Sequence, residues 1–321
     1  MSKTRKTKID LLKSKLPSSD IFICCSSFEH RCLCIPERIK TKEIPYIIIF
    51  ENESGSKRIK DNTKKISELF APEKTTIIKH NFSDSLRLAD SLVTVINHIK
   101  GNELRVIVDI STFTHEVLLL CLKILNNSKK IRSILCVYLN AKEYCPNTER
   151  NKKWLSHGCK DVHSVLGFPG MLFPSQKTHL ILIVGYEYSR AFDAISILEP
   201  NSITLLYGCP ESSTTSKDKE ANGFFMDLVR QMAFEYKDIE CSKVVKCDDP
   251  QNVCDILQDL FGRHEGDNII VVPMNNKLST VGVAMASFHN ENVQICYAPA
   301  IDYNEDNYSL SGDDCYYFKL K

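Results

Sequence analysis

The sequence predicts an α/β protein made of two tandem units, each a doubly wound parallel sheet, related by internal duplication. Three observations support this fold class. Apolar runs of strand length alternate with amphipathic stretches of helix length through both halves of the chain. The apolar runs lack alternating polar residues, as expected when both faces of a sheet are covered. Three stretches of the first half also recur, in the same order, in the second half.

The first half contains five apolar runs, such as IFICCS and YIIIFE, separated by longer amphipathic segments. A regular alternation of strand and helix implies a parallel sheet with helices on both of its faces. The expected strands are 21–26, 46–51, 75–80, 105–110 and 133–139, and the expected helices lie near 28–40, 56–70, 83–99 and 112–127.

The second half repeats this alternation, beginning with the apolar run HLILIVG. This half again predicts five strands and four helices, so in each half a helix separates every strand from the next. The expected strands are 179–185, 202–208, 241–247, 268–273 and 293–299, and the expected helices lie near 187–199, 216–236, 249–264 and 277–289.

Three matches indicate that the halves are copies of one unit. SSFEHR (26–31) corresponds to VGYEYSR (184–190), and 106–125 aligns without gaps with 270–289. The loops VYLNAKEY and CYAPAIDY share the pattern Tyr, two residues, Ala, one residue, an acid and Tyr. We interpret these loops as equivalent ends of the fifth strand in each unit. The alternative is that strands of any α/β protein resemble one another.

The expected domains are a first unit at 1–145, with a basic N-terminal helix at 1–16, and a second unit at 178–321, which includes a C-terminal tail. The proline- and glycine-containing segment 146–177 is expected to be a linker or crossing segment. Residue types that bind zinc occur in or beside it, but their spacing fits no standard pattern, so an ordinary connector is favoured and no metal site is expected. These residues are Cys145, His157, Cys159 and His163.

Composition places the chain among globular proteins. It has 321 residues, 43% hydrophobic and 25% charged, with a formal net charge of +1. That charge gives no indication of nucleic-acid binding. No apolar run reaches the roughly 18 residues that a membrane helix needs, and the basic start has no apolar signal core, so we expect a cytoplasmic protein without a membrane partner. Many of the 14 cysteines lie in apolar runs, which favours free buried thiols over disulfides.

Candidate ligand-binding residues follow the strands. In an open parallel sheet, ligands bind beyond the carboxyl ends of the strands, where helix N-termini direct free N–H groups. Small, hydroxyl and amide residues gather at these positions and suit a phosphate or a ribose, so a nucleotide-type small ligand is the expected partner. The candidates are Ser26, Ser27, Glu29, Arg31, Asp109, Ser111, Thr112, Thr114, Gly185, Glu187, Arg190, Asn275, Asn276 and Lys277.

Each candidate also has a purely structural explanation. Ser111 or Thr112 could cap the following helix. Glu29 with Arg31, and Glu187 with Arg190, could form ion pairs within the protein. Lys277 could be a solvated charge, although its place between two asparagines and a helix of small residues favours an anion contact. Neither a Walker A nor a G-x-G-x-x-G sequence occurs, and no cofactor is expected.

The stretch VIVDISTFTHEVLLLCLKIL resembles the fourth-strand motif of CARF domains, the Rossmann-like nucleotide sensors of bacterial antiviral systems. In that family an apolar strand ends in Asp, followed by a Ser/Thr- and Gly-rich turn and a basic residue. Asp109, Ser111, Thr112 and Thr114 match, with His115 in the basic position, but Phe113 stands in place of a turn glycine. PMNNKLSTVG is similar, with Lys277 as the basic residue. The resemblance implies a tandem Rossmann-like protein that binds a cyclic or linear oligonucleotide or another nucleotide.

Two other functions remain open. A hydrolase or glycosidase acting on a nucleotide could use Glu29, Asp109 and His115 as catalytic residues, because paired carboxylates serve such cleavages. In the second copy, Pro273 takes the place of Asp109 and Ser279 that of His115, which would suit one active centre or an asymmetric ligand. The third function is a non-catalytic scaffold that binds a partner effector protein or a second copy as a homodimer.

Overall fold

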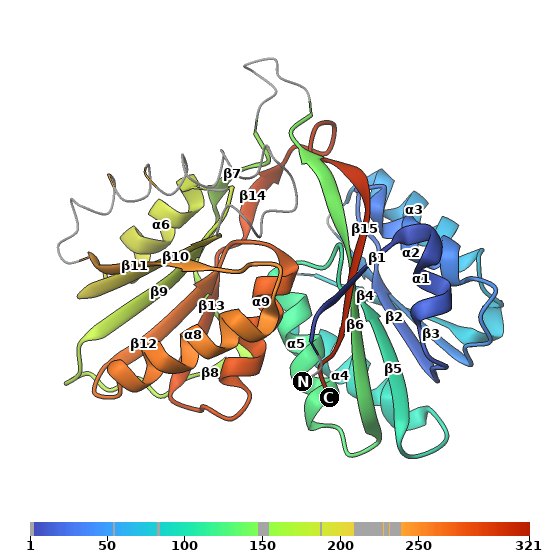
Figure 1. The fold of residues 1–321 in the computed structure, drawn as a ribbon, viewed down its shortest axis with the longest axis horizontal. Coiled ribbons are helices and arrows are strands. Elements are labelled where there is room, and N and C mark those ends of the chain that lie inside the picture. The colour runs from blue at the N-terminus through green and yellow to red at the C-terminus, as the bar shows by residue number, and fades with distance from the viewer. Residues whose placement is uncertain are drawn as a thin grey trace. The chain divides into compact units, whose positions relative to one another are not determined.

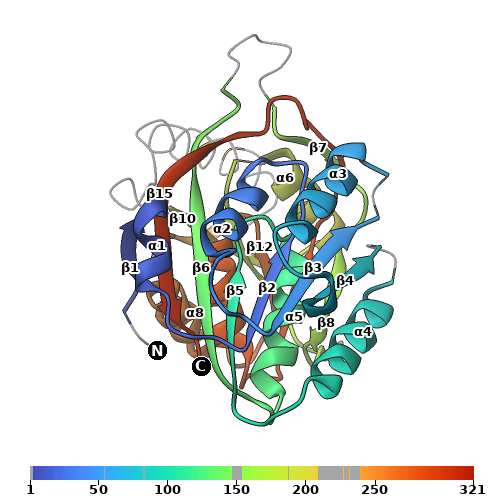
Figure 2. The same cartoon turned by 90° about the vertical axis from the view of Figure 1, so that its right-hand side faces the viewer.

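The structure is a computed structural model that describes residues 3–53, 55–81, 84–146, 154–186, 188–208, 227, 231 and 239–321. It divides into two compact units (Figures 1 and 2). The first unit comprises Met1–Lys142 with Ser309–Lys321, and the second comprises Glu143–Tyr308.

The first unit contains a seven-stranded sheet in the order β1-β15-β6-β5-β2-β3-β4. Strands β2 to β5 pair in parallel, and β6 pairs in parallel with β5, whereas β1 pairs antiparallel with β15. The central strands are buried along their length, which explains their lack of polar alternation. The strands are β1 (Arg5–Lys8), β2 (Ile21–Cys25), β3 (Tyr46–Asn52), β4 (Thr75–His80), β5 (Leu104–Asp109), β6 (Ile131–Tyr144) and β15 (Ser309–Lys319).

The helices of the first unit form two groups: α1 contacts α2 and α2 contacts α3, while α4 contacts α5. The strand order reverses between β4 and β5, so the two groups cover opposite faces of the sheet. One face packs through Phe22, Ile35, Ile39, Ile47 and Ile107. The helices are α1 (Ile9–Lys15), α2 (Arg31–Ile39), α3 (Lys57–Ser67), α4 (Ser85–His98) and α5 (His115–Asn127), with a 3-10 turn at Pro72–Lys74.

The second unit contains a six-stranded sheet in the order β11-β10-β9-β12-β13-β8, with β8 antiparallel at one edge, and a two-stranded ribbon of β14 and β7. The strands are β7 (Ser156–Cys159), β8 (His163–Pro169), β9 (Thr178–Val184), β10 (Ser202–Gly208), β11 (Ile239–Val245), β12 (Asn268–Pro273), β13 (Val293–Tyr297) and β14 (Ala300–Tyr303). The helices are α6 (Tyr188–Leu198), α8 (Pro250–Arg263) and α9 (Lys277–Ser287). The helix expected over 216–236 lies outside the described residues, apart from 227 and 231.

The two units share one topology. Their parallel strands follow the orders β4-β3-β2-β5-β6 and β11-β10-β9-β12-β13, which are the same when counted along the chain. The prediction of two Rossmann-like units is therefore confirmed. The loops with the shared tyrosine pattern differ in detail, because β6 runs through its loop to Tyr144 whereas β13 ends at Tyr297 and the ribbon strand β14 follows.

Three segments differ from expectation. The N-terminal segment forms strand β1 before the short helix α1, so a single helix at 1–16 was wrong. The C-terminal tail, expected with the second unit, supplies β15 to the first sheet. The segment 146–177 contributes β7 and β8 to the second unit. Strands such as β15 and β8, added to the parallel sheets, pair through backbone groups, so their residues carry little information about which sheet they join.

The described part of the chain holds no helix with the length and apolar character needed to cross a membrane. The twelve cysteines that can be described are all free thiols, and nine of them are buried.

Candidate functional site

The loops after β2 and β5 lie side by side, because these two strands are neighbours in the first sheet. Thr112 joins them directly: its Oγ1 donates a 2.7 Å hydrogen bond to Cys25 O at the end of β2. The sequence-predicted residues Ser26, Ser27, Glu29, Arg31, Asp109, Ser111 and Thr112 all lie in or beside these two loops, and all are buried.

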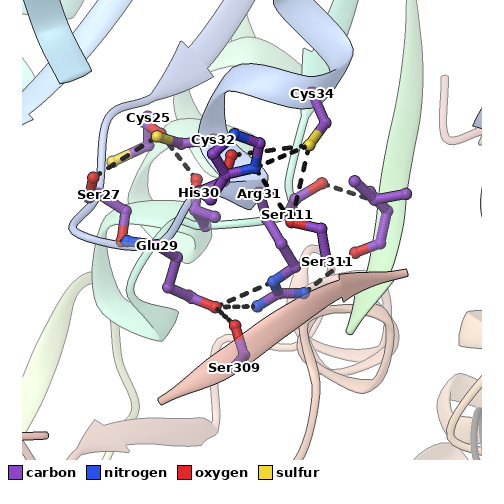
Figure 3. Close-up of polar contacts among 12 residues, drawn as sticks. Cys25, Ser27, Glu29, His30, Arg31, Cys32, Cys34, Ser111, Ser309 and Ser311 are labelled. Atoms are coloured by element: carbon purple, nitrogen blue, oxygen red, sulfur yellow. Dashed lines mark hydrogen bonds and ion pairs between the residues drawn. The ribbon is translucent and has the colours of Figure 1, made fainter. Parts of the chain in front are cut away.

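Glu29 and Arg31 form a buried ion pair. Arg31 Nη2 lies 2.8 Å from Glu29 Oε2, and Arg31 Nε donates to the same oxygen at 2.9 Å. Arg31 Nη1 donates to Leu139 O at 3.0 Å, and Ser309 Oγ donates to Glu29 Oε2 (Figure 3). The side chain of Arg31 is 4% exposed and that of Glu29 is 8% exposed, so both interact with groups inside the protein. Removing one member of such a pair leaves an uncompensated buried charge.

Asp109 is a buried carboxylate at the end of β5. Its Oδ1 accepts hydrogen bonds from the backbone N–H of Ser111 at 3.0 Å and from Ser111 Oγ. Its Oδ2 has no hydrogen-bond partner among the described residues. Burial raises the pKa of Asp109 to about 6, because the low-dielectric interior disfavours the charged form, while Ser111 and the charge of Arg31 act in the opposite direction.

The serines after β2 stabilise the loop. Ser26 donates both its backbone N–H and its Oγ to Phe50 O, at 2.8 and 3.1 Å, and accepts from Thr63 Oγ1 at 2.7 Å. Ser27 Oγ accepts from the backbone N–H of Glu29 at 3.2 Å. Because these hydroxyls are already hydrogen-bonded inside the protein, they contribute chiefly to holding the loop in shape.

The N-terminus of α5 carries the more accessible residues of the first unit. Thr114 caps the helix by accepting from the backbone N–H of Val117, and both Thr114 and His115 are half-buried. Glu116 is buried and accepts a 2.7 Å hydrogen bond from Ser85 Oγ. Burial lowers the pKa of nearby His80 to about 4, opposed by the charge of Glu116. His80, the last residue of β4, and Glu116, which directly follows His115 in the motif, were not among the sequence-predicted candidates.

At the equivalent edge of the second unit, the backbones of the loops after β9 and β12 approach each other closely. A β-carbon at Gly185 would lie 3.0 Å from Met274 C, so only glycine fits after β9. Asn275 Nδ2 donates to Val184 O, which joins the loops after β9 and β12. Asn276 caps α9 by accepting from the backbone N–H of Ser279 at 2.9 Å. Lys277 opens the helix and is half-buried.

The other residues singled out in the second unit have different surroundings. Arg190 is buried in α6, and its Nη1 donates to Ser156 Oγ at 3.4 Å. Glu187 lies outside the described residues, so its pairing with Arg190 stays a prediction. His157 stacks on Trp154 with ring centroids 4.1 Å apart, and His163 Nδ1 lies 3.3 Å from Asp161 Oδ1.

A second group of residues at the first site comes from β15. Ser311 Oγ lies 3.4 Å from His30 Nδ1 and accepts from Cys34 Sγ at 3.7 Å, and Ser309 reaches Glu29 (Figure 3). Alternate residues of a strand face the same side, so Ser309 and Ser311 both meet the start of α2. The sequence analysis missed them because it assigned the tail to the other unit.

The electrostatics of the two edges differ. Around the first loop pair two carboxylates, Glu29 and Asp109, share the single guanidinium of Arg31. At the second edge the equivalent of Asp109 is Pro273, and the nearby candidates are amides and Lys277. Both edges present a capped helix N-terminus, which favours negative charge.

No family model and no curated protein matches the sequence. Among solved structures, the chain is similar to a type III CRISPR defence DNA nuclease that is activated by cyclic oligoadenylate. The TM-score is 0.51 and the sequence identity is 6%, and the match covers 86% of this chain and 65% of that chain. A second similarity, to the cytoplasmic domain of a prokaryotic cation chloride cotransporter, has a TM-score of 0.24 and 11% identity over 91% of this chain and 98% of that one, and carries no argument. At 6% identity, the first similarity shows a shared fold.

Proposed function

We propose that this chain binds a nucleotide or a second-messenger oligonucleotide at the carboxyl edges of its sheets, and that it serves as a sensor or regulatory protein in bacterial antiviral defence. The main support for this proposal is that a helix N-terminus occupies the same position in both units. Helices α5 and α9 each follow the fourth strand of their unit, each is capped by its own side chain, and each opens with a basic residue, His115 or Lys277.

The chemistry of these positions suits phosphate. A helix N-terminus offers free N–H donors and a partial positive charge, and a neighbouring cation adds a charge-assisted hydrogen bond. Thr114, His115, Asn275, Asn276 and Lys277 are all partly exposed, so they remain accessible from solvent. The likeness in fold to a nuclease that cyclic oligoadenylate activates supports an oligonucleotide as the ligand class.

Burial assigns a different role to the other candidates of the first unit. Glu29, Arg31, Asp109 and Ser111 bond to one another and to backbone groups, so we propose that they shape the loops beneath the ligand. They would then affect affinity through the positions of the loops rather than by direct contact with phosphate.

One observation favours the hydrolase or glycosidase alternative: the pKa of Asp109, raised to about 6, is of the kind found in catalytic acids. The carboxylate is, however, 1% exposed, and one oxygen is held by Ser111. A general acid must come within hydrogen-bonding distance of its substrate, so this chemistry requires the loop to open. Binding without turnover is the function that the closed geometry supports better.

Isothermal titration calorimetry against mononucleotides, linear oligoadenylates and cyclic oligoadenylates tests the proposal, with chromatography of each mixture to detect turnover. Lys277→Ala and His115→Ala should each weaken binding about ten- to a hundredfold, as expected for loss of a charge-assisted hydrogen bond. The matched control is Lys74→Ala, an exposed lysine in the 3-10 turn before β4, at the amino edge of the first sheet, which should leave affinity unchanged.

The outcomes separate the three functions. Binding that depends on Lys277 or His115, with ligand recovered intact, supports the sensor. Conversion of the ligand, lost in Asp109→Asn while binding persists, supports the enzyme instead. If none of the nucleotides binds and a partner protein or second copy associates with the chain, the scaffold is the correct function.

A further inference from the structure

A continuous line of hydrogen bonds crosses the first unit beneath the two candidate loops. Asp109 accepts from Ser111 Oγ, and Ser111 Oγ accepts from the backbone N–H of Leu139 at 2.9 Å. On the other side of the same residue, Leu139 O accepts from Arg31 Nη1 at 3.0 Å. Arg31 pairs with Glu29, which accepts from Ser309 Oγ (Figure 3). We call these six residues the Leu139 relay: Glu29, Arg31, Asp109, Ser111, Leu139 and Ser309.

The relay holds β6 at the point where it leaves its neighbouring strand. Pairing of β5 with β6 ends at Asp109 and Val137, followed by one backbone bond from Ile110 N to Val137 O. Two residues later, the N–H and C=O of Leu139 are both bonded to side chains, Ser111 from one candidate loop and Arg31 from the other. The position of β6 here therefore depends on the state of both loops.

Two strands of the relay, β6 at its middle and β15 at one end, also carry the chain's connections between its units. The chain leaves the first unit at Lys142, three residues after Leu139 in β6, and returns at Ser309, the first residue of β15. Asn140 links the strands as well, because its Oδ1 accepts from the backbone N–H of Asp314 at 3.1 Å. Both covalent connections are thus bonded to the candidate loops.

Burial makes the relay sensitive to small changes. Glu29, Arg31, Asp109 and Ser111 are all at most 9% exposed. In a low-dielectric interior, hydrogen bonds to charged groups are strong and reinforce one another along a chain, whereas a missing partner is costly. A shift of either loop therefore either moves β6 and β15 with it or leaves a buried polar group unpaired.

We propose that the Leu139 relay couples the conformation of the two candidate loops to that of β6 and β15, so that the ligand of the first unit regulates the two connections to the second unit. The regulatory part of this inference rests on the proposed function, whereas the coupling itself is a property of the chain without ligand. Thermodynamic coupling is reciprocal, so a change at either end of the relay must be felt at the other.

Hydrogen–deuterium exchange on the full chain without ligand tests the coupling. Ser309→Ala removes a donor at one end, and Ser111→Ala removes the hydroxyl at the other. Ser309→Ala should speed exchange in the peptide covering 110–114, and Ser111→Ala should speed it around Ser309, each by about two- to tenfold, the range expected for one hydrogen bond. The control is Ser67→Ala, whose hydroxyl donates within its own helix to Lys64 O.

Faster exchange confined to the strand or loop that carries each substitution would overturn the proposal. Arg31→Lys gives an independent variant if a serine variant does not fold, because a lysine keeps the charge but lacks the fork that joins Glu29 to Leu139. It should speed exchange at both ends; an effect at one end alone again contradicts coupling.

A second arm adds cyclic oligoadenylate to the wild-type chain. Protection gained at 110–114 together with 139–142 and the start of β15 supports regulation through the relay, and protection of the loops alone refutes it. If cyclic oligoadenylate does not bind, this arm uses whichever nucleotide binds in the calorimetric panel. If none of them binds, the proposed function fails, while the reciprocal exchange of the first arm still decides whether the coupling exists.

Discussion

Asn140 and Gly312 lie against each other on the neighbouring strands β6 and β15. A β-carbon placed on Gly312 would be 2.7 Å from Asn140 Cγ and 2.9 Å from Asn140 O. The side chain of Asn140 occupies the space that any larger residue at 312 would need. It also accepts a hydrogen bond from the backbone of Asp314, so it cannot move aside without losing that bond.

Gly312→Ala should therefore lower the free energy of unfolding by about 1–3 kcal/mol, the usual cost of overpacking a close contact. Gly262→Ala is the matched control, because a β-carbon there meets nothing within 4 Å and alanine favours helix. Chemical denaturation followed by circular dichroism measures both. A Gly312→Ala protein as stable as the control would show that β15 is not held against Asn140.

Arg31→Ala should destabilise the first unit by about 3–5 kcal/mol, because it leaves the buried carboxylate of Glu29 without its cation. Arg132→Ala breaks an ion pair with Glu103 whose side chains are 67% and 71% exposed, and should cost at most about 1 kcal/mol. Thermal and denaturant unfolding compare the two variants. Similar losses in both would contradict the assignment of Glu29 and Arg31 as a buried structural pair.

The stability of the first unit should carry a pH signature of Asp109. Its folded-state pKa, about 6, lies above the 3.8 of an ordinary aspartate side chain, so the folded protein binds a proton here more readily than the unfolded chain. The charged carboxylate is therefore a penalty above about pH 6, and this penalty fades as the pH falls through 6 toward 4.

Asp109→Asn removes that titration while keeping an oxygen that can accept from Ser111. Relative to wild type, its unfolding free energy should rise by about 3 kcal/mol between pH 4 and pH 7, since two pKa units correspond to about that energy. Urea unfolding at a series of pH values measures the difference. A difference that does not change with pH would mean that Asp109 has an ordinary pKa.

The cysteines should react in two classes. In the native protein the half-buried Cys34, Cys145 and Cys159 are expected to react first with a thiol reagent. The nine buried ones should react only on unfolding; for example, burial raises the pKa of Cys121 to about 12, which suppresses the reactive thiolate. Peptide mapping after alkylation identifies the sites. A denaturing, non-reducing titration should find all 14 thiols, and a clear shortfall would point to disulfides.

Much of the fold could be predicted from the sequence. Buried parallel strands are marked by runs such as IFICCS, and helices by the longer segments between them, because hydrophobic periodicity reports burial directly. The ordered matches between the halves predicted two units of one topology, and the strand orders agree. The loops after β2 and β5 could also be placed together, because adjacent strands bring their carboxyl ends to one edge.

Tertiary structure alone decided which of these polar residues face a partner inside the protein. From the sequence, Glu29 and Arg31 could bind a ligand or form an ion pair within the protein. Which of these holds depends on Leu139 and Ser309, which are remote in sequence. The strand β15 joins the first sheet through backbone hydrogen bonds that no side-chain pattern encodes. Local sequence thus determined the elements and their order, whereas long-range pairing determined which polar groups are buried, because burial is a property of the packed chain.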